Sequence, residues 1–406
     1  MHLAVVASHP IQYHAPLYRE LARRLDLTVF FAHRATPADQ AKAGFGVKFE
    51  WDNDLLTGFD YAFLNNVARH AGIDRFGGCD TPDIATKLVE GRVDAVLVQG
   101  WHLKSYLQAA FAAKRLRLPV LARGDSHLHT PRSILKSAVK TVIYRPFLRL
   151  FDAGLYAGRR SREYWMHYGY PEARLFFSPH CVDADWFRAG ATVAARAALR
   201  ARLGFAADTK VILFVGKIVP FKRPLDLIAA ALQLTQTMGN VAVLVAGSGE
   251  LEREMASAAQ RGGLQFHHLG FCNQTEMPAV YATADILVLP SDGNETWGLV
   301  ANEALACGRP IIVSDAAGCA PDLAADGTVG RIFPVGDVAA LAGAIRDVLV
   351  SPPAPEFIAA RSRAYGAAAA ADGIEEALAG IAHSGLAKID LIARVESDAN
   401  RPAASP

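Results

Sequence analysis

Short apolar runs alternate along the whole chain with longer segments in which apolar residues recur at helical spacing. In the first half these runs are LAVVAS (3–8), LTVFFAH (27–33), DAVLVQG (94–100), PVLARGD (119–125), AGLYAG (153–158) and RLFFSPH (174–180). In the second half they are KVILFVGKI (210–218), VAVLVAGSG (241–249), LQFHHLGF (264–271), ADILVLPS (284–291), PIIVSD (310–315) and VGRIFPV (329–335). Runs without polar alternation are typical of parallel strands covered by helices on both faces. The pattern therefore predicts two Rossmann-like, doubly wound α/β domains that face each other across a cleft.

The length of 406 residues exceeds what one ordinary hydrophobic core holds. The segment 182–208, rich in Ala, Arg and Asp, separates the two halves. We predict a first domain over 1–185 and a second over 186–350, with helices after about 355 packing back on the first. The polar, aperiodic end of the chain predicts a flexible tail over 385–406.

Composition excludes several classes of protein. The formal net charge of +2 argues against a nucleic-acid binder, whose basic excess is large and clustered. No apolar run is long enough to span a membrane, and the start MHLAVVASHP predicts a buried strand rather than a signal peptide. The five cysteines form no CxxC pair, which predicts reduced, mostly buried thiols and a cytoplasmic protein.

Glycine, serine and charged residues follow the predicted strands, where ligands bind in open α/β sheets. After the strand ending at Val215, Gly216 permits a close backbone approach, and Lys217 and Lys222 can neutralise a diphosphate. Solvated surface lysines are the alternative explanation of this pair. The loop from Gly247 to Gly249 precedes a helix whose amides can bind anions, but it lacks a complete dinucleotide-binding fingerprint.

The stretch NETWGLVANEALACGRP (294–310) places two glutamates around a helix start. A helix beginning near Trp297 presents amides around Gly298 and Leu299, where positive charge favours a phosphate. Glu303 can accept hydrogen bonds from the two hydroxyls of a ribose, and Glu295 can do the same for a sugar. Ordinary solvent-facing acids would show the same spacing.

The segment 211–322 resembles the nucleotide-binding domain of the group 1, or family-4, retaining glycosyltransferases, which have the two-domain GT-B fold. Glu295 and Glu303 match the E-x7-E element of that family. Its glycine-basic-x4-lysine element matches Gly216, Lys217 and Lys222, although the first basic residue is commonly arginine. Two later elements resemble 270–291 and 306–323, and Trp297 stands where a phenylalanine is often found.

The resemblance implies transfer of a sugar from a nucleoside diphosphate to an acceptor such as a lipid-linked or polysaccharide precursor. It assigns the ribose to Glu303, the phosphates to Lys217 and Lys222, and the sugar to Glu295. Base recognition is expected around Phe271–Thr275, which includes Cys272. We expect no metal and no cofactor besides the donor, because the lysines and the helix start already supply positive charge. The D-x-D segments at 52–54 and 183–185 do not follow strands of the nucleotide domain.

The acceptor is expected in the first half, where the resemblance is less specific. The turn after the first strand carries His9, Gln12, Tyr13 and His14 as candidate lining residues, although buried histidines satisfied by backbone are equally common. Where many relatives have a His-Gly pair that contacts the transferred sugar, this chain has Arg123–Gly124. We expect Arg123 and Asp125 to line the cleft, and which of Arg123, Asp125 and His127 contacts the sugar stays open.

The segment 131–152 predicts a basic amphipathic helix. Arg132, Lys136 and Lys140 lie together beside the apolar residues Ile134, Leu135, Val139, Val142 and Ile143. Such a helix can rest on an anionic membrane, with Phe147, Leu148 and Phe151 adding apolar insertion. An ordinary domain helix with a basic solvated side is the commoner explanation.

Two other functions fit parts of the pattern. A nucleotide-sugar 2-epimerase shares the GT-B fold, and incubation with labelled nucleotide-sugar alone separates it from a transferase. A two-domain solute-binding protein closing on its ligand is a second alternative, but it does not need the paired glutamates.

Overall fold

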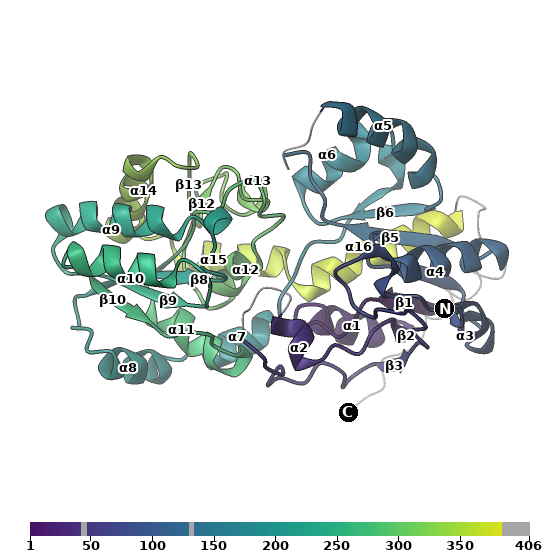
Figure 1. Ribbon diagram of the computed structural model, residues 1–406, viewed down its shortest axis with the longest axis horizontal. Helices are drawn as coiled ribbons and strands as arrows, with labels where there is room; N and C mark the ends of the chain where they lie inside the picture. Colours follow the sequence, from purple (N-terminus) through teal and green to yellow (C-terminus); the bar gives the residue numbers. More distant parts are fainter. Residues whose placement is uncertain (42–46, 130–133, 384–406) are drawn as a thin grey trace.

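The computed structural model describes residues 1–41, 47–129 and 134–383 as two α/β domains that lie side by side (Figure 1). The predicted tail over 385–406 lies outside the described residues. The first domain has a seven-stranded parallel sheet in the order β3-β2-β1-β4-β5-β6-β7. Its strands are β1 (His2–Ala7), β2 (Asp26–Phe31), β3 (Asp60–Phe63), β4 (Ala95–Val98), β5 (Val120–Gly124), β6 (Ala153–Tyr156) and β7 (Leu175–Phe177).

The second domain has a six-stranded parallel sheet in the order β10-β9-β8-β11-β12-β13. Its strands are β8 (Lys210–Val215), β9 (Val241–Ala246), β10 (Gln265–His268), β11 (Ile286–Leu289), β12 (Ile311–Ser314) and β13 (Gly330–Phe333). Both orders reverse beside the first strand of the domain, which is the doubly wound pattern. The predicted fold class, α/β with two Rossmann-like domains, is confirmed.

Every apolar run predicted as a strand contains one. Over 1–41, 47–129 and 134–383, the one strand that the apolar pattern missed is β3. This edge strand begins with two exposed residues, Asp60 and Tyr61, so it lacks the continuous apolar run of a buried strand. Only its pairing with β2 identifies it as part of the sheet.

Helices cover both sheets. In the first domain they are α1 (Ala15–Ala22), α2 (Pro37–Gln40), α3 (Ile84–Glu90), α4 (Lys104–Arg115), α5 (Ile134–Leu148) and α6 (Arg159–His167). The following helices are α7 (Ala184–Gly190), α8 (Val193–Arg202), α9 (Pro224–Met238), α10 (Glu252–Arg261), α11 (Met277–Thr283), α12 (Leu299–Ala306), α13 (Ala320–Leu323), α14 (Val338–Val350), α15 (Pro355–Ala364) and α16 (Ala367–His383).

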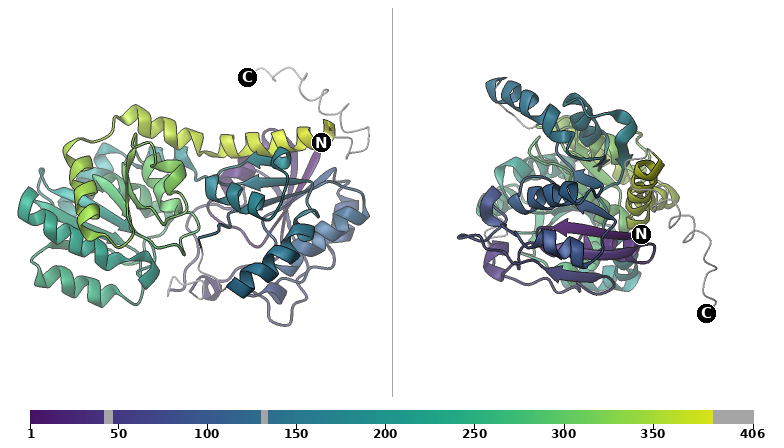
Figure 2. Two further views of the ribbon diagram at one scale, coloured as in Figure 1. Left: turned by 90° about the horizontal axis from the view of Figure 1, so that it is seen from above. Right: turned by 90° about the vertical axis from the view of Figure 1, so that its right-hand side faces the viewer.

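The last helix returns to the first domain, as Figure 2 shows for the yellow end of the ribbon. Ala370 and Ile374 of α16 are fully buried in one cluster with Leu3 and Val5 of β1. Gly373 fits directly against the carbonyl of Phe177, where a Cβ atom would lie 1.7 Å from the oxygen. The chain therefore crosses between the domains twice, once before α7 and once before α16.

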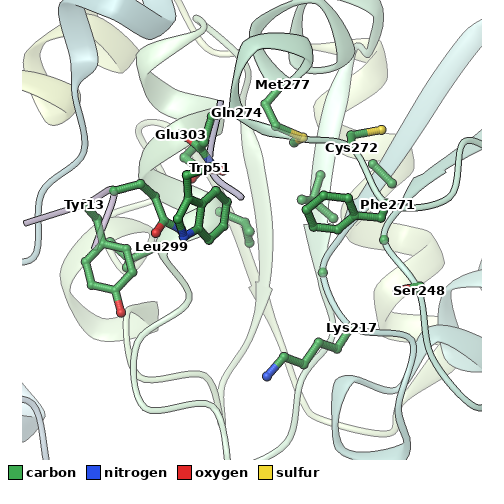
Figure 3. Close-up of a pocket in the computed structure, with 16 residues that line it drawn as sticks. Tyr13, Trp51, Lys217, Ser248, Phe271, Cys272, Gln274, Met277, Leu299 and Glu303 are labelled. Carbon is green, nitrogen blue, oxygen red and sulfur yellow. The ribbon is translucent and has the colours of Figure 1, made fainter. Parts of the chain in front are cut away.

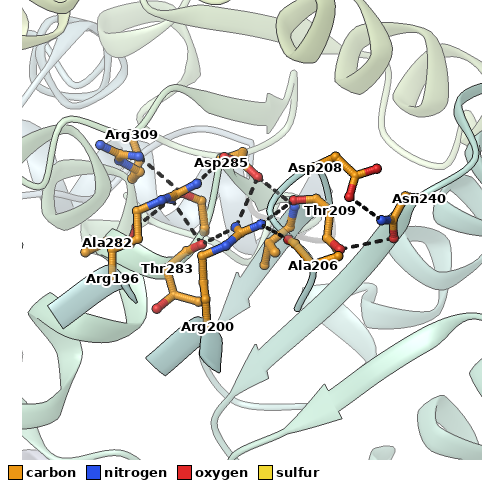
Figure 4. A network of polar contacts seen from close by, with 12 residues as sticks. Arg196, Arg200, Ala206, Asp208, Thr209, Asn240, Ala282, Thr283, Asp285 and Arg309 are labelled. Carbon is orange, nitrogen blue, oxygen red and sulfur yellow. Dashed lines mark hydrogen bonds and ion pairs between the residues drawn. The ribbon is translucent and has the colours of Figure 1, made fainter. Parts of the chain in front are cut away.

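Arginines anchor α8 to the rest of the second domain (Figure 4). Arg196 donates to the carbonyls of Ala282 and Ala284, at 2.6 and 2.7 Å, and to Asp285 at 2.7 Å. Arg200 donates to the carbonyl of Thr209 at 2.6 Å, and the second carboxylate oxygen of Asp285 accepts from the Val211 amide at 2.8 Å. This network satisfies carbonyls at the end of α11 and fixes the start of β8 and β11.

Helix α5 differs from the expected membrane-facing helix. Leu148 and Phe151 are fully buried in the core of the first domain, so the prediction that they insert into a membrane is wrong. The Lys140 ammonium lies 4.5 Å from the ring centre of Tyr144 rather than among solvated charges. Val142 and Ile143 are 75% and 57% exposed. Arg132 and the side chains of 134–139 lie outside the described part of the structure.

Among the described residues we find no helix whose length and hydropathy would let it cross a bilayer.

Candidate active site

A cavity lies between the domains, at the carboxyl ends of β8 and β9 and the start of α12 (Figure 3). The second domain contributes Lys217, Phe271 and Glu303 to its wall. The first domain contributes Tyr13 and Trp51. The position agrees with the rule that ligands of open α/β sheets bind beyond the carboxyl ends of the strands.

Glycines form the floor of this cavity. Gly247 has a φ of +140°, and a Cβ atom there would lie 1.9 Å from the carbonyl oxygen of Gly216. Only glycine allows the loops after β8 and β9 to approach so closely. Gly249 does not line the cavity, and its amide donates to Glu252 at 2.6 Å. Gly249, which we predicted to bind the nucleotide, therefore has its amide paired within the second domain.

Glu303 lines the cavity from the second turn of α12 and accepts a hydrogen bond from the Tyr281 hydroxyl at 2.5 Å. Burial raises the pKa of Glu303 to about 7, and the hydrogen bond from Tyr281 acts in the opposite direction. The carboxyl group therefore takes up a proton at a higher pH than an ordinary glutamate does. A ligand that donates hydrogen bonds to it would favour the charged form.

The first residues of α12 line the cavity. Gly298 is the N-cap with a φ of +103°, and Leu299 and Val300 line the wall. Trp297, which we expected beside the nucleotide, does not line the cavity. Its ring is buried, and Nε1 donates a hydrogen bond to Oδ1 of Asn302 at 2.8 Å, which ties the segment before α12 to that helix.

Two lysines and a glutamate meet beside the cavity floor. The Lys222 ammonium donates to Glu295, and the Ser291 hydroxyl donates to the same carboxylate oxygen at 3.1 Å. Burial lowers the pKa of Lys217, the nearby Lys222 lowers it further, and Glu295 opposes both. Glu295, which we predicted to bind the sugar, therefore forms an ion pair with Lys222 in this structure. The side chains of Glu295 and Lys222 are not part of the cavity wall.

A second cavity lies in the first domain and shares Tyr13 with the first cavity. Arg123 and Asp125 line it, as do His9 and His14. His127 does not line it: its ring is buried, and Nδ1 accepts from the His129 amide at 3.1 Å. Of the three candidates that the sequence left open, two therefore face the cleft.

The polar residues of the second cavity are held in place by one another and by backbone. Arg123 is buried and donates to the carbonyl of Pro179 at 2.5 Å. Asp125 lies 3.3 Å from His180 Nε2. Burial acts to raise the pKa of Asp125, but the hydrogen bond and charge of His180 hold it at about 2. Burial lowers the pKa of His9 to about 4, so its ring is neutral at pH 7.

Two residues of the site were missed by the sequence analysis. His180 follows β7 in a segment without a recognised motif, and Trp51 lies in a polar stretch between predicted strands. A tryptophan among acidic residues in an irregular segment is unusual, and that was the available signal for Trp51.

The two D-x-D segments also meet in space. Asp52, Asp54 and Asp183 line a third cavity between the domains, where Arg19 lies 3.6 Å from Asp183. Within the described ranges no group of three or more His, Cys, Asp and Glu side chains is placed to hold a metal ion.

Residues 195–365 match the family model of glycosyl transferases group 1. A D-inositol 3-phosphate glycosyltransferase of Geodermatophilus obscurus is 38% identical over 200 residues, which are 47% of this chain and 43% of that protein. The enzyme of the same name from Mycolicibacterium smegmatis is 35% identical over 176 residues, 43% of this chain and 39% of that protein. The chain thus matches about two fifths of the length of these relatives.

Solved structures extend the similarity to both domains at the level of the fold. The HepE protein of Anabaena in complex with UDP has a TM-score of 0.68 at 18% identity, covering 93% of this chain and 100% of that one. Sucrose-phosphate synthase from Thermosynechococcus elongatus has a TM-score of 0.67 at 19% identity, covering 93% and 98%.

The architecture is that of the GT-B glycosyltransferases. The match to the group 1 glycosyltransferases covers residues 195–365, most of which lie in the second domain.

Proposed function

We propose that this protein transfers a sugar, with retention of configuration, from a nucleoside diphosphate sugar to a hydroxyl of an acceptor. The observation that carries the proposal is that the cavity lined by Lys217 and Glu303 and the first-domain cavity share the lining residue Tyr13. A donor in one cavity and an acceptor in the other would place their reacting groups near Tyr13. Relatives of the same fold bound to UDP and to UDP-glucose support the donor class.

The residues around the cavity floor fit a diphosphate. Lys217 reaches the cavity directly, and the Lys222 ammonium lies beside Gly216. The amides at the start of α12 add partial positive charge. A diphosphate would compete with Glu295 for Lys222. When the donor binds, the ion pair between Lys222 and Glu295 is replaced by one between Lys222 and the diphosphate leaving group. The Glu303 carboxylate accepts hydrogen bonds from the two ribose hydroxyls.

The transfer step then follows the front-face course. The bond between the anomeric carbon and the diphosphate oxygen breaks, and the acceptor oxygen forms the new bond on the same face. The acceptor proton passes to an oxygen of the departing diphosphate. Lys217 and Lys222 stabilise the negative charge that grows on that leaving group, which lowers the barrier because the charge is greatest in the transition state. No step in this scheme uses a metal or a further cofactor.

The first-domain cavity fits an acceptor with hydroxyl groups. Burial lowers the pKa of His9 and His14, so both present neutral imidazoles, which donate and accept hydrogen bonds. The charges of Arg123 and Asp125 offset each other. Glycans and lipid-linked glycan precursors carry such hydroxyls. To reach a lipid-linked precursor, a cytoplasmic enzyme would contact the membrane surface, and the exposed Val142 and Ile143 of α5 would provide that contact.

Two assays test the proposal. A thermal-shift screen with UDP, GDP, ADP and their sugars identifies the donor, because a ligand of the folded state raises Tm. Release of the nucleoside diphosphate is then measured with glycan, lipid-linked and inositol phosphate acceptors, the last because relatives are named for it. Conversion of labelled nucleotide-sugar without any acceptor would instead indicate a 2-epimerase. Absence of binding to every nucleotide would overturn the proposal.

A further inference from the structure

A loop of the first domain reaches the second domain beside Phe271, which lines the cavity together with Trp51. The ring centres of Phe49 and Phe271 are 4.2 Å apart, at an interplanar angle of 38°. The Glu50 carbonyl accepts from the Asn273 side-chain amide at 2.7 Å. We refer to residues 49–52 as the bridging loop.

The bridging loop ends in a polar contact with the start of the 3-10 helix η5 (Gln274–Glu276). Asp52 accepts from the Thr275 backbone amide at 3.1 Å and from the Thr275 hydroxyl. Asp52 is exposed, so these bonds compete with water and each is weak. Contacts of this kind hold a loop in position without locking the two domains together.

Trp51 is the residue that the bridging loop places inside the cavity. Its ring projects into the space that Phe271 borders from the other domain (Figure 3). Phe49 packs edge-on against Trp51, with ring centres 4.7 Å apart and an angle of 85°, and so supports its orientation. The part of the cavity near these rings offers aromatic surface, whereas the end near Lys217 offers positive charge.

We propose that Trp51 binds the base of the donor nucleotide by stacking, so that the donor site is complete only when the first domain contributes this residue. The inference rests on the proposed function. Bases stack on aromatic side chains whatever their hydrogen-bonding pattern, and Phe271 supplies a second apolar surface from the domain that holds the phosphates. Asp52 is a positioning residue, because its bonds to Thr275 hold the loop that carries Trp51.

Stacking by Trp51 would link binding of the base to the arrangement of the two domains. The proposed phosphate-binding residues, Lys217, Lys222 and the start of α12, all belong to the second domain, so a ligand without a base would bind without involving the bridging loop. A nucleoside diphosphate would contact both domains and favour their observed arrangement. Binding of the base and juxtaposition of the two cavities are then linked, since a ligand shifts a conformational equilibrium by its differential affinity.

Calorimetry on the full chain tests this with UDP, GDP, ADP and inorganic pyrophosphate. We expect Trp51→Ala to weaken the best nucleoside diphosphate by about tenfold, in line with the loss of one base stack. Pyrophosphate affinity should stay within about twofold, because that ligand has no base to stack. Trp51→Phe should retain most of the affinity. Phe76→Ala, which removes a 53% exposed ring elsewhere on the first domain, is the matched control and should change nothing. Melting curves establish that each variant is folded.

A double-mutant cycle tests the positioning role. Asp52→Ala should weaken nucleoside diphosphate binding by about threefold alone and have no further effect in the Trp51→Ala background, since residues acting through one contact are not additive. Equal effects in both backgrounds would show that Asp52 does not act through Trp51.

The outcomes separate this inference from the proposed function. If Trp51→Ala binds the nucleoside diphosphate within about twofold of the wild type while Glu303→Ala loses affinity, stacking by Trp51 is overturned and the donor site stands. If the wild type binds pyrophosphate as tightly as every nucleoside diphosphate, there is no base site, and both proposals fail.

Discussion

Tyr281 and Glu303 form a hydrogen bond of 2.5 Å in which the phenol donates to the carboxyl group. The bond orients Glu303 toward the cavity, while burial raises the pKa of Glu303 to about 7. A preoriented acceptor beside a cavity fits recognition of a diol, because each of two hydroxyls can donate to one carboxylate.

We expect Glu303→Ala to weaken binding of a nucleoside diphosphate by about 1–3 kcal/mol, since it leaves ribose hydroxyls without their acceptor. Calorimetry with the free nucleotide measures the change, and Ala304→Gly in the same helix controls for a general loosening of α12. Unchanged affinity in a folded Glu303→Ala variant would remove the ribose assignment.

The raised pKa of Glu303 predicts a pH dependence. The free protein holds a proton on Glu303 below about pH 7, whereas hydroxyl donors favour the carboxylate, so binding releases protons. Affinity should therefore fall as the pH drops from 8 to about 5.5, with up to about one proton released per nucleotide at the acid end. Calorimetry in buffers of different ionisation enthalpy counts these protons. Glu303→Gln removes the titrating group and should abolish that share of the release; equal release in both proteins would contradict the assignment.

Lys222→Ala should lower kcat more than it weakens donor binding, because the charge of the leaving diphosphate is greatest in the transition state. Initial rates at varied donor concentration, combined with a direct measurement of donor affinity, separate the two effects. Lys210→Ala, at the exposed start of β8, is a suitable control. Equal losses in kcat and affinity would reduce Lys222 to a binding residue.

We expect full transferase activity in excess EDTA. Lys217, Lys222 and the start of α12 supply the positive charge that a cation would otherwise bring to the diphosphate. The rate is compared before and after chelation, and then with added magnesium. A clear loss that magnesium restores would contradict the metal-independent scheme.

If the acceptor is lipid-linked, the wild type should bind anionic liposomes at low salt and release them as salt rises. Lys140 is an unsuitable site for the test, since it packs over Tyr144. Val142→Glu with Ile143→Glu changes two exposed residues instead and should reduce binding, while turnover of a short water-soluble acceptor continues. Val193→Glu, at an 85% exposed position on α8, is the matched control. If the wild-type protein does not bind anionic liposomes at low salt, α5 is an ordinary domain helix without a membrane-binding role.

Much of the fold could be predicted from the chain because its signals are local. Continuous apolar runs such as 241–246 arise only where both faces of a strand are covered, and each run predicted as a strand contains one. The group 1 elements around Gly216, Glu295 and Glu303 were also recognisable, because their spacing within one domain reflects loops that follow neighbouring strands.

What the chain alone could not decide is which residues meet across the cleft. Leu148 and Phe151 fit an amphipathic membrane helix by spacing, yet the packing of the first domain buries both. Glu295 carries the family spacing, but its partner Lys222 was set by how η4 (Pro220–Lys222) approaches it. Trp51 and Phe271 border one cavity although they are distant in sequence and belong to different domains. Periodicity and motifs report the surroundings of each segment separately. Contacts across the cleft depend on how two separate sheets are placed relative to each other, and only the tertiary structure determines that.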